Sequence, residues 1–397
     1  MQGCKAYRLC SVAVLNELGK EWWIDMKNVQ ISEELFVAIM RYFMLEQEEL
    51  LPQIKQGLEK KLEAMVMREL YTKYKTTLTE EEKEKYFHKI LHAPDGTYTN
   101  AIYGMVRQMN GLIDGWHPDY LAVAFDKTRN TFRRGMFAQY KAQREATPLP
   151  LKQQFVTMQN LLQDVGIPVL LSDTYEADDL AGTLANIHKN DMTVRIVTKD
   201  KDYLQLVDDA CDVRVWFLPT PKDLEEKGPM FDLYRGKDFT TEICPWLKNY
   251  LEYTEAAVIA DKGVTPAQIP DLKGIEGDDS DHYPGVRNVS SAATPLLKEY
   301  GSVEGIYAAI DACEGDAKEE KALSAFWKDS LGIKRSPLNA LKAGRADAAL
   351  CKDLATIRLY CFSEDLLTGK EYRTCKIAEF NKKLLRLGIQ SAFLPEF

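Results

Sequence analysis

Acidic residues gather at two points within residues 176–206 of the chain. They are Glu176, Asp178 and Asp179 at the first point, and Asp200 and Asp202, on either side of Lys201, at the second. Carboxylates held close together repel one another, and divalent cations that prefer oxygen ligands are their usual counter-ions. The two clusters together therefore predict a metal site. For either cluster alone the alternative is structural, because acidic side chains also favour helix N-termini and solvent-exposed turns.

The elements around these clusters indicate strands that end at the acidic residues. Apolar runs at 167–171 and 194–197 are typical of buried strands, and a third run at 120–125 ends on Asp126. In an open α/β sheet, the carboxyl ends of neighbouring parallel strands meet at one edge, where ligands bind. We therefore expect both clusters and Asp126 to share this edge. The alternation of strand and helix favours a mainly parallel sheet.

A basic segment follows Asp126 directly. Its cations are Lys127, Arg129, Arg133, Arg134, Lys141, Arg144 and Lys152, with Phe132, Phe137 and Tyr140 among them. Basic and aromatic residues on one segment suit phosphate contacts and base stacking. The alternative is an exposed amphipathic helix with solvated charge. A metal site that cleaves polyanions needs a positive guide beside it, because negative groups hold its metals, and this favours the nucleic-acid interpretation.

Length and composition bound the class of protein. The 397 residues have room for two or three domains, and 45% hydrophobic with 28% charged residues is ordinary for a soluble protein. A net charge of −9 argues against a wholly basic nucleic-acid coat but allows a local basic face. Eight cysteines without a CxxC pair suggest reduced thiols. Because no apolar run reaches the roughly 18–20 residues that span a bilayer, we expect a cytoplasmic protein without membrane contact.

Several ordered motifs extend this interpretation. They are TNAIYG, AFD followed by TFR, YKAQR, EADD, TKDKDYLQL and GDDSDHYPGV, spread over residues 93–361. Together they resemble the bacterial and phage 5′-to-3′ exonuclease family, which includes the N-terminal nuclease domain of DNA polymerase I and the flap endonucleases. The resemblance implies a PIN-like α/β domain with a mainly parallel sheet flanked by helices. It also implies an arch over the active site and a small all-helical domain with a helix–three-turn–helix.

The resemblance also implies which residues form the site. The metal ligands would be Asp126, Glu176, Asp178, Asp179, Asp200, Asp202, Asp278 and Asp281. The catalytic cations of the arch would be Arg133, Lys141 and Arg144, and the DNA-binding residues would be Arg129, Arg134, Arg287, Asn288 and Ser290. Two Mg²⁺ ions, for which Mn²⁺ can substitute, would activate a water molecule and stabilise the leaving 3′-oxygen. A K⁺ ion is implied in the helix–three-turn–helix.

The resemblance, together with changes in composition and hydrophobic periodicity along the chain, predicts five segments. They are a helical N-terminal extension (1–87), a catalytic α/β domain (88–217), a connecting insertion rich in proline and charge (218–250), a helix–three-turn–helix domain (251–361) and a C-terminal tail (362–397). The stretch 26–85 resembles small helical proteins encoded on conjugative elements, which implies no chemistry. By itself, the acidic loop at 278–281 is also compatible with a solvent-exposed turn.

The chain departs from the family pattern in two places. No apolar strand ending in Asp-Gly precedes PDGTYTN, and WWID, ending at Asp25, is only a faint candidate for it. We expect the loss of that aspartate to weaken metal binding. Asn288 and Ser290 stand where glycines are usual, Ala292 stands where a lysine is common, and His282 replaces an asparagine. We therefore expect weaker binding of duplex DNA.

The sequence thus predicts a metal-dependent 5′-3′ exonuclease or flap endonuclease that acts on DNA 5′ ends, flaps and nicked duplexes in replication or repair, as a monomer. Two alternatives stay open. One is a catalytically weakened DNA-binding relative on a mobile element, for which the absent first aspartate is the main argument. The other is an interaction protein whose helical front binds a partner.

Overall fold

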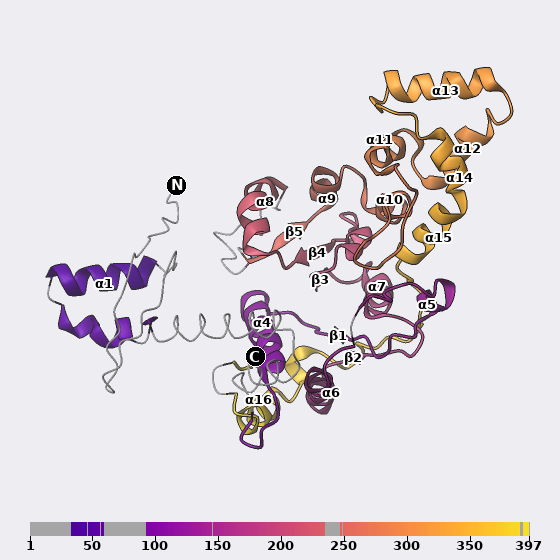
Figure 1. Cartoon of the computed structure of the whole chain (residues 1–397). Coiled ribbons are helices and arrows are strands. Elements are labelled where there is room, and N and C mark those ends of the chain that lie inside the picture. Colours follow the sequence, from indigo (N-terminus) through magenta and orange to yellow (C-terminus); the bar gives the residue numbers. More distant parts are fainter. Residues whose placement is uncertain are drawn as a thin grey trace. The chain divides into compact units, whose positions relative to one another are not determined.

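The computed structural model describes residues 33–45, 47–55, 57–58, 93–144, 146–234, 247, 249–389 and 392–396. The chain divides into two compact units, Met1–His92 and Ala93–Phe397. In the first unit, α1 (Glu33–Leu45) precedes the short helix η1 (Glu48–Leu50) (Figure 1). Leu35, Ala38 and Ile54 are buried there. Residues 51–55 and 57–58 are also helical, while the rest of the helical extension predicted for residues 1–87, and Asp25, lie outside the described residues. The likeness of 26–85 to conjugative-element proteins stays a prediction.

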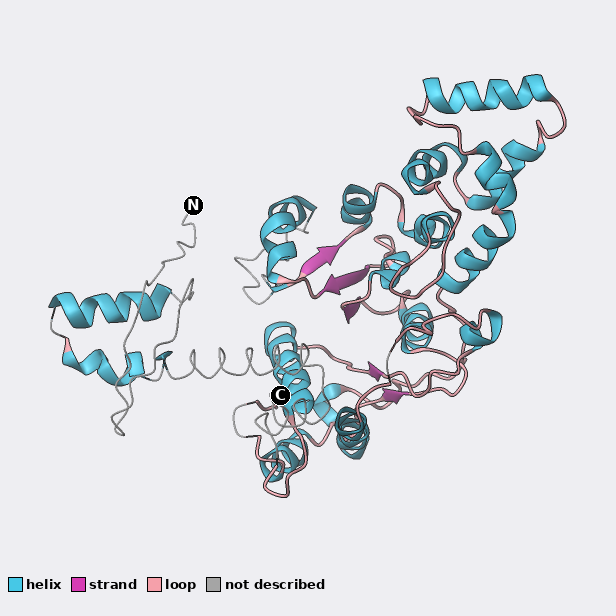
Figure 2. Cartoon of the chain, viewed as in Figure 1, coloured by secondary structure: helices cyan, strands magenta, loops and turns pink. Residues whose placement is uncertain are grey.

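The described part of the second unit contains two short sheets. In the first, β1 (Val123–Ala124) pairs in parallel with β2 (Val169–Leu170). In the second, β3 (Val194–Thr198) pairs in parallel with β4 (Val213–Phe217), and β4 pairs antiparallel with β5 (Leu251–Tyr253). Figure 2 shows how little strand there is among the helices. The predicted α/β class with parallel pairing is confirmed, although the sheet is divided into two pieces.

The first core lies beside β1 and β2. Its helices are α4 (Asn100–Trp116), α6 (Leu149–Asp164) and α16 (Ile377–Arg386), while α5 (Phe132–Met136) and α7 (Ala177–His188) carry site residues. Val106 of α4, Leu162 of α6 and Phe380 of α16 are fully buried in one cluster. The C-terminal segment thus completes the apolar core on which the first sheet rests.

The second core joins β3–β5 to the helical part of the unit. These elements are η2 (Lys201–Leu206), α8 (Pro221–Tyr234), α9 (Glu255–Lys262), η5 (Pro266–Gln268), α10 (Ile269–Glu276), α11 (Ser290–Tyr300), α12 (Val303–Asp311), α13 (Ala317–Asp329), α14 (Leu338–Ala343) and α15 (Arg345–Ala355). A last short helix, η6 (Tyr372–Thr374), precedes α16. Val215, Ile275 and Leu296 are fully buried in this cluster. The helical domain expected after the sheet is present.

The stretch predicted as a connecting insertion, 218–250, includes α8. Phe231 of α8 is 1% exposed, and its ring centroid lies 4.6 Å from that of Tyr253 in β5. Residues 235–246 and 248 lie outside the described residues. The described part of this stretch therefore packs against the second sheet.

A hollow separates the two pieces of sheet. Among the described residues, no ladder of hydrogen bonds joins β1 to β3. A cavity of about 360 Å³ is lined by Val123 of β1 and Ile196 of β3, with Met109 of α4 and Leu184 of α7. As far as the structure describes the chain, the sheet is thus interrupted between β1 and β3. Within the described residues, no helix is long and apolar enough to cross a membrane.

Candidate active site

The first acidic cluster lies at the N-terminus of α7. Glu176 precedes the helix, and its backbone N–H donates to Asp179 Oδ2 at 3.1 Å in a capping box. The helix N-terminus stabilises negative charge there, so capping of α7 accounts for part of this acidic cluster without any metal ion. Asp126, at the end of β1, joins the cluster because its Oδ1 accepts from the backbone N–H of Ala177 at 2.8 Å.

Arg133 is buried among these carboxylates. Its side chain is 1% exposed, and its two terminal nitrogens lie 2.6 and 2.7 Å from the two oxygens of Asp179, which is fully buried. It also donates to the carbonyl oxygens of Leu354 and Thr356, at 2.8 and 3.1 Å. The guanidinium therefore links α5 to α7 and to the C-terminal end of α15. In this arrangement Arg133, predicted as a catalytic cation of the arch, holds the acidic cluster together and does not face solvent.

Asp178 occupies a more open position. Its Oδ1 lies 3.6 Å from Arg133 Nη1, and its side chain is 14% exposed. Burial raises the pKa of Asp178 to about 7, and the nearby Asp179 and Glu176 carboxylates add to this against the lowering effect of Arg133. A raised pKa of this kind is typical of a carboxylate whose charge lacks full compensation.

The rest of the basic segment connects the first cluster to the acidic loop after α10. Lys141 Nζ lies 2.7 Å from Glu176 Oε2, and Arg144 Nη2 lies 2.5 Å from Asp281 Oδ1. The Tyr140 hydroxyl lies 3.1 Å from both Glu176 and Asp281. Burial opposes the charge of Lys141, but Glu176 and Asp281 outweigh it and raise the pKa of its ammonium group. Two of the predicted catalytic cations, Lys141 and Arg144, thus contact predicted metal ligands.

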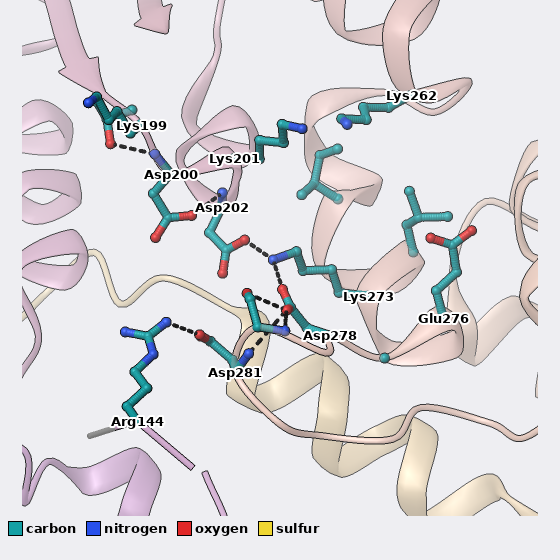
Figure 3. Close-up of a pocket in the computed structure, with 15 residues that line it drawn as sticks. Arg144, Lys199, Asp200, Lys201, Asp202, Lys262, Lys273, Glu276, Asp278 and Asp281 are labelled. Carbon is teal, nitrogen blue, oxygen red and sulfur yellow. Dashed lines mark hydrogen bonds and ion pairs between the residues drawn. The ribbon is translucent and has the colours of Figure 1, made fainter. Parts of the chain in front are cut away.

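The second acidic cluster is neutralised by a lysine that the sequence analysis missed. Lys273 Nζ of α10 bridges Asp202 and Asp278, at 2.6 Å from Asp278 Oδ2 (Figure 3). Burial raises the pKa of Asp202 to about 6, and Asp200 adds to this effect while Lys273 opposes it. In the sequence, the lysine of PDLKGIEGDD resembles any solvent-facing helix lysine. Only the packing of α10 against η2 reveals its role.

Two glycines fix the loop that holds Asp278 and Asp281. Gly277 has φ +79° and Gly285 has φ +60°, and a Cβ on Gly285 would lie 2.3 Å from the backbone nitrogen of Gly277. The loop closes on itself at a point that only glycine permits. Asn288 also has a positive φ, of 63°, which asparagine tolerates.

Tyr203 of η2 is buried and directly follows the second acidic cluster in the chain. Burial raises the pKa of the Tyr203 hydroxyl well above its ordinary range, and the carboxylates of Asp178, Asp200 and Asp126 add to this. The predicted DNA-binding residues Arg129, Arg134, Arg287, Asn288 and Ser290 are all exposed. Arg129 also donates to the Arg144 carbonyl oxygen at 2.9 Å.

A cavity of about 600 Å³ opens over the second cluster (Figure 3). Its charged lining consists of Asp200, Asp202, Asp278, Asp281 and Glu276 with Arg144, Lys199, Lys201, Lys262 and Lys273. Lys199, Lys201 and Lys262 were not singled out from the sequence. Acidic groups beside lysine and arginine side chains suit a ligand that carries both phosphates and bound cations.

The donor set fits a divalent cation in chemistry but not in its present arrangement. All the predicted ligands are carboxylates, which Mg²⁺ and similar ions take. All but Asp126 and Asp200 lie within ion-pair distance of Arg133, Lys141, Arg144 or Lys273. Across the described ranges, no three carboxylate, imidazole or thiol groups surround one point as metal ligands would. The chain's own cations act as the counter-ions.

Replacing Lys273 by methionine is expected to lower the free energy of unfolding by about 1–3 kcal/mol in metal-free buffer, because Asp202 and Asp278 lose their shared cation. A divalent cation can then take its place. Adding MnCl₂ should therefore raise the thermal midpoint of Lys273→Met more than that of the unaltered protein. Lys262→Met, which alters a lysine lining the same cavity, is the control. Equal shifts in all three proteins would contradict this role for Lys273.

Comparison with known proteins identifies the family. Two family models match, the 5′-3′ exonuclease N-terminal resolvase-like domain over residues 82–232 and the 5′-3′ exonuclease C-terminal SAM fold over residues 264–374. DNA polymerase I of Bacillus caldotenax is 34% identical over 271 residues, which cover 68% of this chain and 26% of that protein. DNA polymerase I of Bacillus subtilis (strain 168) is 32% identical over 314 residues, 76% of this chain and 30% of that protein. The chain belongs to the bacterial 5′-3′ exonuclease family.

Both parts of the family pattern are thus present, in order along the chain, while the chain spans under a third of the length of these polymerase relatives. Solved structures are more distant. A T5 5′-exonuclease with bound zinc ions has a TM-score of 0.44 and 19% identity, covering 73% of this chain and 91% of that one. The catalytic core of Rad2 in complex with a DNA substrate has a TM-score of 0.41 and 16% identity, covering 77% and 84%.

Proposed function

We propose that this chain is a divalent-metal-dependent 5′-3′ exonuclease or flap endonuclease that hydrolyses phosphodiester bonds of DNA in replication or repair. Family membership supports this proposal. The observation that carries it is the cavity of about 600 Å³ after β3, whose lining combines the carboxylates of Asp200, Asp202 and Asp278 with lysine and arginine side chains.

Asp126, Asp178 and Asp200 are the proposed first ligands of a Mg²⁺ ion, for which Mn²⁺ can substitute, because the chain's own cations engage them least. When bound, such an ion supplies a water molecule of lowered pKa and a counter-charge for the phosphoryl oxygens. Arg144, half exposed at the cavity, and the lysines on its rim would hold the phosphate of the scissile bond.

The exposed cations away from this cavity are proposed to position DNA. Arg129 and Arg134 on the basic segment and Arg287 before α11 have exposed side chains, which suits contacts with phosphates at the protein surface. Asn288 and Ser290 are proposed to contact the duplex backbone and a K⁺ ion at the start of α11. We propose that the protein works as a monomer in the cytoplasm.

One observation favours a second candidate function, a weakened relative that binds DNA without cutting it efficiently. In the described part of the chain the sheet is interrupted between β1 and β3, and internal cations engage most of the predicted metal ligands. A carboxylate on a strand between β1 and β3 would add a ligand to the site. Where no such carboxylate is present, a metal ion has to displace the internal cations from the predicted ligands or share those ligands with them.

A cleavage assay separates the two functions. The full chain is incubated with 5′-labelled flapped and nicked duplexes in Mg²⁺, and again in EDTA. We expect shortened products with Mg²⁺, none with EDTA, and recovery when excess Mg²⁺ is restored, because removal of the ion removes the activated water. Binding of the flapped duplex with no product in either Mg²⁺ or Mn²⁺ would reject the nuclease and leave the DNA-binding relative.

A further inference from the structure

A second cavity, which we call the aromatic pocket, lies beside the first acidic cluster. It measures about 340 Å³, and its lining residues are Phe132, Thr174, Tyr175, Arg358, Leu359 and Tyr360. None of the predicted metal ligands or catalytic cations contributes a side chain to it, and Phe132 is its one residue from the basic segment. Three aromatic rings, an aliphatic side chain and one guanidinium form most of its walls. The pocket therefore offers flat apolar surfaces and one positive charge.

Tyr360 is unusually exposed for a ring on a fixed backbone. Its exposed fraction is 86%. The backbone on both sides is held, because Arg358 N donates to Asp179 Oδ1 at 2.8 Å and Cys361 N donates to Thr183 Oγ1 at 3.1 Å. The Ile357 amide is fixed as well, by Gln205 Oε1 at 2.9 Å. A ligand that stacks on Tyr360 therefore does not have to order the loop first, which lowers the cost of binding.

The other walls suit a nucleobase rather than a purely apolar ligand. The Arg358 guanidinium lies 5.0 Å from the centroid of the Phe132 ring, and the Phe132 and Tyr175 rings are 5.7 Å apart. Arg358 Nη2 lies 2.6 Å from Asp353 Oδ1, but both side chains are partly exposed (32% and 49%), so the guanidinium can exchange this surface ion pair for a phosphate. Aromatic faces with an arginine at hand stack bases of single strands without sequence preference. A peptide would need backbone hydrogen-bonding groups, and the lining offers chiefly rings.

The aromatic pocket is directly connected to the acidic cluster. Phe132 lies between Thr131, whose hydroxyl donates to Glu176 Oε1 at 2.9 Å, and Arg133, which holds Asp179. Tyr175 immediately precedes Glu176. A base in the pocket would therefore lie next to the residues that position the candidate site, where a strand end that is to be cut must be held.

We propose that the aromatic pocket binds an unpaired nucleobase of a single-stranded DNA end, stacked on Tyr360 with its phosphate near Arg358. This inference rests on the proposed function, because it assumes that DNA is the substrate, but it concerns binding and not cutting. The ring of Tyr360 supplies the stacking surface. Arg358 supplies the positive charge.

The test uses the full chain in EDTA, so that nothing is cut. Fluorescence anisotropy measures Kd for a hairpin with a 5′ extension of thymidines, and for the same hairpin with an extension of abasic units, which carries equal charge but no bases. We expect the thymidine extension to bind at least about fivefold more tightly. Tyr360→Ala should abolish that preference, while Tyr360→Phe keeps it. Phe326→Ala, which removes another exposed ring, on α13, is the matched control.

Equal affinity of the unaltered chain for the two hairpins would overturn the inference and leave a protein segment as the alternative occupant. So would a Tyr360→Ala variant that keeps the full preference. If the chain binds neither hairpin, the inference also fails. The cleavage assay in Mg²⁺ tests the proposed nuclease activity separately. If the anisotropy experiment rejects the pocket but a Tyr360→Ala variant still cuts a flapped duplex, the proposed nuclease activity stands.

Discussion

Replacing Arg133 by alanine is expected to lower the free energy of unfolding by about 3–5 kcal/mol, because it leaves a buried carboxylate without its partner. Asp179 is fully buried, and both its oxygens accept from Arg133, at 2.6 and 2.7 Å. The same guanidinium satisfies the carbonyl oxygens of Leu354 and Thr356. A loss of this size is a large part of the ~5–15 kcal/mol that keeps a typical domain folded.

Urea denaturation followed by circular dichroism measures this loss, and three variants make the test specific. Arg134→Ala removes the exposed neighbouring cation and should change stability by under ~0.5 kcal/mol. Arg133→Lys keeps the charge but loses the two-pronged contact, so it should fall between. The double variant Arg133→Met with Asp179→Leu removes both charges and should regain part of the loss. An Arg133→Ala midpoint equal to that of the unaltered protein would contradict the structural role of the pair.

Because Asp179 is buried and paired with Arg133, it is a poor choice for testing the role of the carboxylates in cleavage. Asp179→Asn would weaken the contact with Arg133, and it would also disturb the hydrogen bond from the Arg358 backbone N–H at 2.8 Å. A loss of cutting in that variant would therefore report unfolding as much as catalysis. A carboxylate at the open end of a strand is a better probe.

The positions of the strand-end carboxylates could be predicted because they follow from local pattern. Apolar runs before Asp126 and Asp200 indicated strands, and β1 and β3 do end just before these two residues. The helix after Glu176 could be predicted from its local pattern as well. By contrast, β1 and β2 are shorter than the apolar runs that predicted them, since ladder hydrogen bonds depend on a neighbouring strand and not on the run itself.

The ion pairs and the aromatic pocket could not be predicted, because they form between residues far apart in the chain. Lys273 reaches Asp202 across 71 positions, and the Arg358 backbone reaches Asp179 across 179. Arg133 was identified as a cation near the site, but its burial depends on the packing of the C-terminal end of α15. Motif spacing predicts which charged residues lie close together only if the fold is known from the family. It does not predict which of these residues form ion pairs with one another.

Asp200→Asn is expected to reduce the rate of cleavage about 100-fold or more while the fold stays intact, since loss of even a supporting group at a metal site costs about 10–100-fold. Asp200 is exposed at the end of β3. Its Oδ1 accepts from the Asp202 backbone N–H at 2.9 Å and so caps η2, and asparagine caps a helix equally well. The substitution therefore removes a charge and little else.

Asp191→Asn is the matched control for this prediction, because Asp191 is exposed and precedes β3, whereas Asp200 follows it. The same chemical change is then made at the opposite end of one strand. Single-turnover cleavage of a flapped duplex in Mg²⁺ gives the rates, and thermal unfolding in EDTA shows that both variants are folded. If Asp200→Asn cuts as fast as Asp191→Asn, the strand-end carboxylate takes no part in the reaction. A lower rate that higher Mn²⁺ concentration partly restores would place the defect in metal binding, because a weaker site fills at higher ion concentration.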